Sequence, residues 1–369
     1  MRSHRNTRIE RRRLFIEKRF RKGNLLSGEI IDALMPVSFR HEGFYHGRVF
    51  KLKEKGPDEK GVILINYNET MAKLRLKYDM SSILKDYNIA LELSYYGCCI
   101  PEIMQFLEHK DSDIVVGVVQ DLESRFLERL EANIHSADYS SSTWVDDRAF
   151  YNLNLEKEYD CIMVAMWNDI KRHYLLFEAI KEIGDPSYRA CLVGGAWGRV
   201  RADIEEMADY YGIRKNITVF EKIPPDQVNV LLNKSKVNLL LSLKEGGNKA
   251  IVEGMFADVP AIVLSEHLGI APQWINENTG MLADKHRLKD ALLHFRTSFA
   301  KYRPRDWAMN NISCKASTAK LEKKLKELAT NKNQPWITPL AIKVNRPECE
   351  YYDDNCKLTP FNLEKYLRR

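Results

Sequence analysis

The sequence predicts an α/β protein with parallel strands. Short apolar runs alternate with segments of helical spacing along most of the 369 residues, and this alternation is typical of repeated strand–helix–strand units. The apolar runs end in polar or glycine-rich turns. The chain is too long for one ordinary hydrophobic core, so we expect parallel α/β packing distributed over two domains.

The first half of the chain carries strand-like runs separated by turns and helical patterns. The expected strands are 62–67, 89–93 and 114–119, and the expected helices are 101–108 and 122–132. Small polar residues at 136–142 and an acidic, polar stretch at 151–160 then interrupt the pattern. Such composition is typical of linkers, so a domain boundary is expected near 150–160.

The second half shows the alternation more regularly. The expected strands are 161–166, 189–193, 217–220, 237–243 and 260–264, and the expected helices are 173–183, 200–211 and 226–233. Right-handed crossovers between such strands give a doubly wound sheet, whose ligands bind at the carboxyl ends of the strands. The turns that follow the strands should therefore converge on one crevice. Further helices are expected in the tail, at 315–328 and 363–369.

The net charge of +6 is unevenly distributed. Residues 2–22 contain ten Lys or Arg against only Glu10 and Glu17, with an apolar stripe between the cations. This basic arm, residues 1–23, suits contact with an anionic membrane surface. It equally suits nucleic-acid phosphates, or a solvated leader with no partner.

Several classes of protein are excluded by composition and pattern. No run of eighteen or more uncharged apolar residues occurs, so a membrane span is not expected. The basic start lacks the apolar segment of a secretory signal. The seven cysteines are scattered without a CxxC pair, which favours reduced thiols over a disulfide frame or a zinc site. We expect a cytoplasmic protein, with peripheral contact at the inner face of the membrane through the basic arm.

The most informative segment is 242–254. An apolar run ends in a glycine-rich turn and a helical pattern follows, which places Glu245 at the end of a strand and Glu253 about two turns into a helix. Gly246 and Gly247 let backbone N–H groups approach a ligand, and the helix N-terminus favours anions. One carboxylate for hydroxyls, amides for phosphate and a second carboxylate for a diol together suit a nucleotide-sugar.

This segment, with its E-x7-E spacing, resembles the retaining GT-B glycosyltransferases of family 4. Further similarity lies in Lys171 after the first strand of the second half, in Val193-Gly194-Gly195 before a helix, and in the motif at 278–282. The resemblance covers roughly residues 160–285. It implies two Rossmann-like domains facing across a cleft, with C-terminal helices that pack back across both. The implied parts are the arm at 1–23, an acceptor domain at 24–155, a donor domain at 156–310 and a helical tail at 311–369.

The resemblance also implies roles for individual residues. Glu245 would bind donor-sugar hydroxyls near the anomeric carbon, and Glu253 would accept hydrogen bonds from the ribose diol. As an alternative, Glu253 is a helix-surface partner of Lys249 at i, i+4. The residues expected to contact the diphosphate through cations or backbone amides are Lys171, Arg172, Gly194, Gly195, Gly246, Gly247, Asn248 and Lys249. Met166 stands where the family has an arginine, so Arg172 or Lys249 would supply the second cation.

The expected activity is transfer of a hexose, with retention, from a UDP- or GDP-type sugar to an acceptor hydroxyl. The acceptor would be a glycan or a lipid-linked glycan in polysaccharide biosynthesis. No cofactor and no metal are expected, because no DxD motif lies at a strand end and cations with helix-terminal amides can neutralise the leaving diphosphate. Three alternatives stay open: a nucleic-acid-binding protein that uses the basic arm, a non-catalytic GT-B partner, and a sugar-nucleotide epimerase.

Overall fold

The computed structural model describes residues 11, 14–16, 18–19, 28–34, 49–130, 133–346, 349–356 and 358–368. The basic arm at 1–23 lies almost wholly outside these residues, and so does its predicted contact with a membrane or nucleic acid. The chain forms two compact units. Unit 1 comprises Met1–Ser141 and Ser317–Arg369, and unit 2 comprises Ser142–Ala316.

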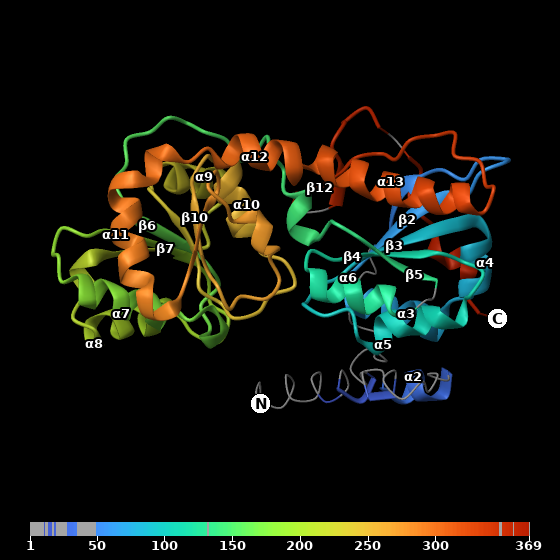
Figure 1. Ribbon diagram of the computed structural model, residues 1–369, viewed down its shortest axis with the longest axis horizontal. Helices are drawn as coiled ribbons and strands as arrows, with labels where there is room; N and C mark the ends of the chain where they lie inside the picture. The colour runs from blue at the N-terminus through green and yellow to red at the C-terminus, as the bar shows by residue number, and fades with distance from the viewer. Residues whose placement is uncertain are drawn as a thin grey trace. The chain divides into compact units, whose positions relative to one another are not determined.

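Unit 1 is a sheet of order β1-β2-β3-β4-β5 with helices on both faces (Figure 1). The strands are β1 (Val49–Lys53), β2 (Gly61–Asn66), β3 (Tyr87–Glu92), β4 (Ile114–Gly117) and β5 (Ile134–Ala137). Pairing is parallel from β2 to β5, whereas β1 is antiparallel at the edge. Every residue of β2 is buried, as expected of a parallel strand covered on both faces.

The helices of unit 1 follow from this strand order. The crossovers are α3 (Asn68–Lys77), α4 (Met80–Asp86), α5 (Pro101–Met104) with the 3-10 turn η2 (Gln105–Glu108), and α6 (Asp121–Glu128). Since the strands progress in one direction, right-handed crossovers put the helices on one face. Figure 1 shows α3, α5 and α6 on one side of the sheet and α13 (Cys314–Asn331) on the other. The predicted helix at 101–108 is thus divided between α5 and η2.

The tail beyond α13 is mostly non-helical. It forms a hairpin of β12 (Lys343–Asn345) and β13 (Cys349–Tyr351), then one 3-10 turn, η9 (Leu363–Tyr366), where a short α-helix was expected. Buried Lys53 ties the tail to the sheet, because its Nζ lies 2.8 Å from Glu59 Oε2 and 3.4 Å from the centre of the Trp336 ring. Glu59 also accepts from the Ile337 amide at 2.9 Å.

Unit 2 is an all-parallel sheet of order β11-β10-β9-β6-β7-β8. The strands are β6 (Cys161–Val164), β7 (Ala190–Gly194), β8 (Ile217–Glu221), β9 (Asn238–Leu240), β10 (Ala261–Leu264) and β11 (Gly280–Ala283). The strand order reverses beside β6, because the chain runs outward to β8 and returns to place β9 on the other side of β6. Ligands of open α/β sheets bind at such a switch point.

The helices of unit 2 lie on both faces of its sheet (Figure 1). They are α7 (His173–Ile183), α8 (Arg201–Tyr210), α9 (Pro225–Asn233), α10 (Lys249–Phe256), α11 (Leu288–Ser298) and α12 (Pro304–Asn311). The crossovers α7 and α8 share a face with α11, and α9 and α10 cover the opposite face. The predicted strand at 237–243 is shorter in the structure, since the chain leaves the sheet after Leu240.

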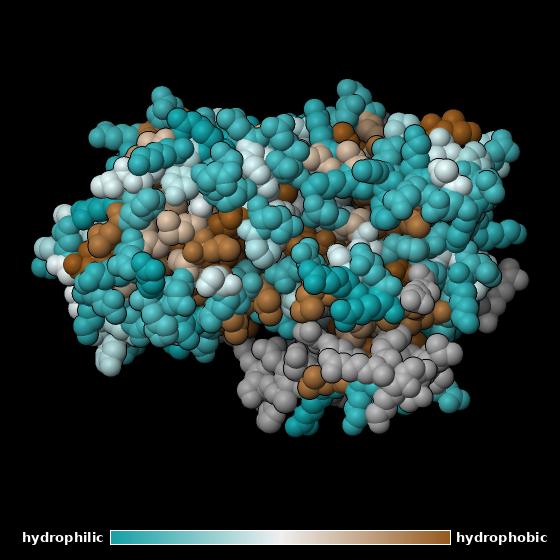
Figure 2. Space-filling view, viewed as in Figure 1, coloured by the Kyte–Doolittle hydropathy of each residue, from teal (hydrophilic) through white to brown (hydrophobic). Residues whose placement is uncertain are grey.

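Among the described residues, none of the helices has the length and apolar character needed to span a membrane. Figure 2 shows a largely hydrophilic face on which apolar residues form small patches. Isolated apolar side chains of this kind are ordinary on a protein surface.

Gly280 gives a test of the sheet in unit 2. Its φ is +156°, and an added Cβ would lie 2.0 Å from the Ala261 carbonyl oxygen, at the start of the β10–β11 pair. Gly184 also has a positive φ, +66°, but a Cβ there would meet nothing closer than 3.9 Å. We predict that Gly280→Ala lowers the free energy of unfolding by about 3 kcal/mol or more and Gly184→Ala by about 1 kcal/mol. Urea denaturation measures both, and equal losses would contradict the register of β11.

Candidate active site

The candidate site lies in unit 2 at the carboxyl ends of β6 and β9, where the strand order reverses. Lys171 follows β6 in the 3-10 turn η4 (Asp169–Lys171), and Glu245 follows β9. The Lys171 ammonium lies 2.6 Å from Glu245 Oε1, although the two residues are 74 positions apart. The reversal of strand order therefore brings together Glu245, which was expected to bind the donor sugar, and Lys171, which was expected to contact the diphosphate.

The Glu245 carboxylate is held by hydrogen-bond donors from three segments. Oε1 accepts from Lys171 Nζ at 2.6 Å and from Ser242 Oγ at 2.5 Å, and Oε2 accepts from Asn248 Nδ2 at 2.9 Å. Its side chain is only 11% exposed, and that of Lys171 18%. Because a buried carboxylate is costly unless paired, these three contacts hold the carboxylate in one position.

Asn248 links this carboxylate to the helix that follows. Its side-chain oxygen accepts from the Ile251 amide at 2.9 Å, which makes it the N-cap of α10. The Gly246 and Gly247 amides in the preceding turn donate to no group in the described part of the chain. These N–H groups and the positive end of the helix dipole lie directly beside Glu245, an arrangement suited to an anion.

The backbone around Glu245 requires a glycine that the sequence analysis missed. The Glu245 amide donates to the Leu268 carbonyl at 2.9 Å, and the Leu268 amide donates to Leu243 at the same distance. Gly269 follows with a φ of +121°, and a Cβ there would lie 1.9 Å from the Glu245 carbonyl oxygen. Only glycine permits this close approach between the two turns.

His267 is a second residue that the sequence analysis missed. Its Nδ1 lies 2.7 Å from the carbonyl oxygen of Ser242, the residue whose hydroxyl donates to Glu245. Burial lowers the pKa of this imidazole, which favours the neutral ring. A neutral ring whose Nδ1 carries the proton donates to Ser242, so His267 supports the turn that holds Glu245.

Glu253 lies on α10 and has a half-buried side chain. Its carboxylate forms no hydrogen bond or ion pair with any described residue, so the expected alternative of pairing with Lys249 is not formed. Burial raises the pKa of Glu253 to about 7, against the opposing effect of the Lys249 charge. A carboxylate without a protein partner is available to accept hydrogen bonds from a ligand.

Arg172 pairs with a carboxylate other than Glu245. It has a left-handed backbone, with φ +58°, at the junction of η4 and α7, and its guanidinium donates to Glu266 at 2.7 Å. Gly194 serves close packing, because a Cβ there would lie 2.3 Å from the Ala165 carbonyl oxygen. Among the described residues, no hydrogen bond or ion pair joins the Arg172 guanidinium to Glu245.

A different cation lies at the neighbouring strand end. A Cβ at Gly195 would lie 3.3 Å from Lys222 Cγ and 3.6 Å from Met166 Cε, so both side chains pass over this glycine. Lys222 directly follows β8, is exposed, and forms no ion pair within the described residues. Met166 stands where the resembled family has an arginine, and Arg172 or Lys249 was expected to supply the second cation. The structure places Lys222 beside Met166 instead.

No group of three or more His, Cys, Asp or Glu is arranged to hold a metal among the residues described. The chemistry that this site offers is therefore one oriented carboxylate, one unpartnered carboxylate, unsatisfied amides and lysine charges.

Comparison with known proteins places the fold in a class. Residues 146–299, all within unit 2, match the family model described as glycosyl transferases group 1. Sucrose-phosphate synthase from Thermosynechococcus elongatus aligns with a TM-score of 0.57 and 18% identity, over 73% of this chain and 74% of that one. Anabaena Alr3699/HepE, solved with UDP and glucose, aligns with a TM-score of 0.53 and 10% identity, over 72% and 78% of the two chains.

A mutant of Staphylococcus aureus TarM, solved with UDP, fondaparinux and α-GlcNAc-glycerol, aligns with a TM-score of 0.51 and 14% identity. That alignment covers 66% of this chain and 51% of TarM. A search of curated protein sequences gave no match. The two parallel α/β sheets of this chain match GT-B glycosyltransferase structures, which confirms the predicted fold class. Within that class, unit 2 carries the similarity to the group 1 glycosyl transferases.

Glu253 gives a test that needs no ligand. Its carboxyl has a pKa of about 7 in the folded protein, above the ordinary 4.5. The folded state therefore binds this proton more tightly than the unfolded state does, and stability falls as the pH rises from about 4.5 to 7. Between pH 5 and pH 8 the wild type should lose stability through Glu253, whereas Glu253→Gln has no carboxyl at this position to titrate. We predict that the free energy of unfolding of the variant minus that of the wild type therefore increases by on the order of 1–2 kcal/mol over this range. Urea denaturation at both pH values measures it.

The matched control is Glu206→Gln, which alters an exposed carboxylate on α8. Its difference from wild type should be the same at both pH values. If Glu253→Gln behaved like this control, the raised pKa of Glu253 would be contradicted.

Proposed function

We propose that this protein is a retaining glycosyltransferase that moves a hexose from a UDP- or GDP-type sugar to an acceptor hydroxyl, without a metal. The acceptor is a glycan or a lipid-linked glycan. The observation that carries the proposal is the Glu245 carboxylate, fixed by Lys171, Ser242 and Asn248 beside the unsatisfied amides of the α10 turn. The GT-B fold supports the proposal but does not by itself define the reaction.

The Lys171–Glu245 pair suits the junction between sugar and phosphate in the donor. Without ligand, the ammonium and the carboxylate neutralise each other at 2.6 Å. A donor diphosphate adds negative charge near Lys171, and sugar hydroxyls donate to Glu245. Both charges then keep a partner during the reaction, and the negative charge that develops on the leaving phosphate meets a preformed cation.

The rest of the diphosphate charge has several partners in unit 2. The Gly246 and Gly247 amides and the N-terminus of α10 supply partial positive charge. Lys222 supplies a full cation that no described carboxylate neutralises. Lys249 is exposed in the first turn of α10 and adds to the same field.

The nucleoside is assigned to Glu253. Its carboxylate has no partner within the described residues, and two oxygens can accept both hydroxyls of a ribose diol. The pKa near 7 means that the ionised form competes with the protonated form near neutral pH. The complexes of HepE and TarM with UDP support a uridine nucleotide as the first donor to test.

The anomeric configuration would be retained because the diphosphate leaves and the acceptor hydroxyl attacks on the same face of the sugar. A double displacement needs a carboxylate nucleophile, but both oxygens of Glu245 already accept hydrogen bonds from three donors. Such contacts lower the nucleophilicity of a carboxylate and suit it to stabilising positive charge at the anomeric carbon. The leaving phosphate then helps to deprotonate the acceptor, and rate enhancement comes from positioning and electrostatics.

Glu245→Gln tests the proposed role directly. UDP-, GDP-, ADP- and CDP-sugars are first compared by the rise in Tm that they cause, and we expect a UDP- or GDP-sugar to give the largest rise. Glu245→Gln should then reduce transfer of that sugar by about 100-fold or more while the free nucleotide still binds. Glu277→Gln, an exposed carboxylate elsewhere in unit 2, is the control.

Near-full turnover by Glu245→Gln would remove Glu245 from the mechanism. Donor binding without turnover of any acceptor by the wild type would instead favour a non-catalytic GT-B partner, and conversion of the sugar in place would favour an epimerase.

Lys222→Met tests the second cation. We predict that it weakens binding of the nucleoside diphosphate by about tenfold and leaves binding of the nucleoside unchanged, because only the phosphates carry the charge. Lys215→Met is the matched control, since Lys215 is also exposed but lies at the amino end of β8, whereas Lys222 lies at its carboxyl end. Isothermal titration calorimetry measures both, and equal effects of the two variants would contradict the assignment.

A further inference from the structure

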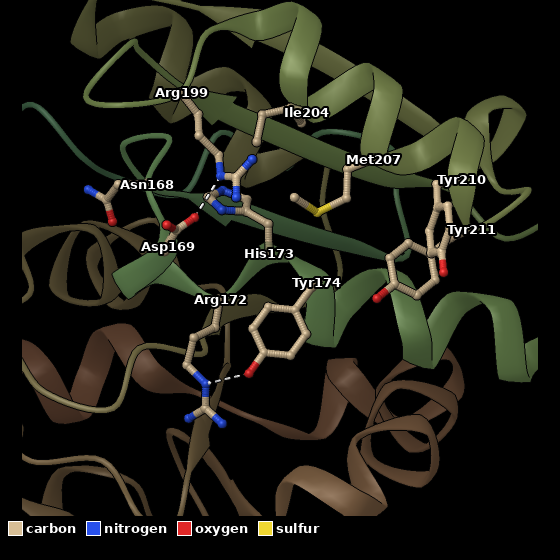
Figure 3. Close-up of a pocket in the computed structure, with 10 residues that line it drawn as sticks. All are labelled: Asn168, Asp169, Arg172, His173, Tyr174, Arg199, Ile204, Met207, Tyr210 and Tyr211. Carbon is tan, nitrogen blue, oxygen red and sulfur yellow. Dashed lines mark hydrogen bonds and ion pairs between the residues drawn. The ribbon is translucent and has the colours of Figure 1, made fainter. Parts of the chain in front are cut away.

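A pocket of about 340 Å³ lies on unit 2 between the start of α7 and the face of α8 (Figure 3). We name it the tyrosine pocket. Its main contributors are His173, Tyr174, Arg199, Met207, Tyr210 and Tyr211. Neither Lys171, Glu245 nor Glu253 lines it. The volume is at the lower end of the roughly 300–1,000 Å³ range of ligand pockets, so it suits a small ligand such as a monosaccharide or disaccharide.

One end of the tyrosine pocket is polar. Asp169 and Arg199 form an ion pair there at 2.6 Å, and Figure 3 shows the His173 ring beside them. His173 is only 3% exposed, and its Nε2 has no hydrogen-bond partner among the described residues. A buried nitrogen left unsatisfied costs about 1–3 kcal/mol, so this end of the pocket favours a ligand that can hydrogen-bond to it.

Burial, together with the charges of Lys171 and Arg199, lowers the pKa of His173 to about 4. The ring is therefore neutral at physiological pH, and it adds no positive charge to the pocket. A neutral imidazole can donate from one nitrogen and accept at the other, which matches a hydroxyl group.

The other end of the tyrosine pocket is aromatic. Tyr174, Tyr210 and Tyr211 stand around it in Figure 3, and Met207 and Ile204 form the apolar wall between the two ends. Tyr210 and Tyr211 pack edge to face with ring centres 5.3 Å apart. Tyr174 is 39% exposed and Tyr210 is 83% exposed, so their rings offer apolar surface with a hydroxyl at the edge.

The charges of the tyrosine pocket are already balanced. Arg199 is paired with Asp169 at 2.6 Å, and Arg172, at the rim, is paired with Glu266 at 2.7 Å. A highly charged anion would have to displace one of these carboxylates. A hydrocarbon tail would leave the His173 nitrogen without a hydrogen-bond partner. A neutral ligand with one apolar face and hydroxyls around its edge satisfies both ends.

We propose that the tyrosine pocket binds a neutral sugar unit of the acceptor glycan, apart from the donor site. A pyranose ring has C–H faces that stack on tyrosine and hydroxyls that reach Asp169, Arg199 and His173. The assignment of that sugar to the acceptor rests on the proposed function, whereas sugar binding in this pocket does not.

The test uses the full chain and three neutral hexasaccharides: maltohexaose, cellohexaose and N-acetylchitohexaose. Saturation-transfer NMR detects binding, and titration gives the Kd for wild type, Tyr174→Ala and Tyr210→Ala. We expect at least one hexasaccharide to bind and each variant to weaken it by about fivefold or more. Tyr151→Ala, which removes an exposed tyrosine of unit 2 outside the pocket, should leave the Kd unchanged.

The proposal is overturned if no hexasaccharide binds, or if binding is equal in the pocket variants and Tyr151→Ala. A sulfated hexasaccharide tests for an anion site, and the proposal is overturned if it binds more tightly than every neutral one. Octyl glucoside tests for a hydrocarbon site, and the proposal is also overturned if only its alkyl chain receives saturation. Tyr210 is largely exposed, so its loss should leave the fold intact, which circular dichroism checks. The Tm rise caused by the donor should persist in both pocket variants, so failure of this pocket is distinguishable from failure of the donor site.

Discussion

The site depends on one buried contact, the Glu245 carboxylate between Lys171, Ser242 and Asn248. Each donor comes from a different part of unit 2: the turn after β6, the end of β9 and the N-cap of α10. Because the strand order reverses beside β6, these segments meet at one edge of the sheet. The carboxylate is thereby held in place before any ligand arrives, which is the condition for electrostatic stabilisation of a transition state.

The surrounding backbone maintains that contact. Gly269 lets the turn after β10 approach the Glu245 carbonyl, and Leu268 pairs with the turn after β9. His267 supports Ser242 through its carbonyl oxygen. A shift in any of these groups would move the carboxylate, because each of them contacts the segment 242–245. By contrast, three polar groups have no partner among the described residues: the amides of Gly246 and Gly247 and the carboxylate of Glu253. These groups are open to a ligand, whereas the Glu245 carboxylate is held in place.

Much of this arrangement could be predicted from local patterns in the sequence. The alternation of apolar runs predicted the parallel sheets, and the helical spacing at 173–183 predicted the bounds of α7. Because parallel strands end at the same edge of a sheet, the turns with Lys171 and Glu245 were also expected to lie together at that edge. Other features depend on partners distant in sequence. Glu266, which pairs with the Arg172 guanidinium, lies 94 residues from it in the sequence. Gly269 and His267 are explained only by the register between two turns, and the tyrosine pocket only by the packing of α7 against α8.

The central claim is that the glycine turn and α10 clasp the phosphates of an activated sugar beside Glu245. Hydrogen–deuterium exchange of the full chain, with and without a saturating donor sugar, tests this most directly. The account predicts that donor binding slows exchange of the amides in 244–253 and in the turn that follows β6, while the N-terminal ends of the same strands are unaffected. Unchanged exchange in 244–253 under a saturating donor would contradict it.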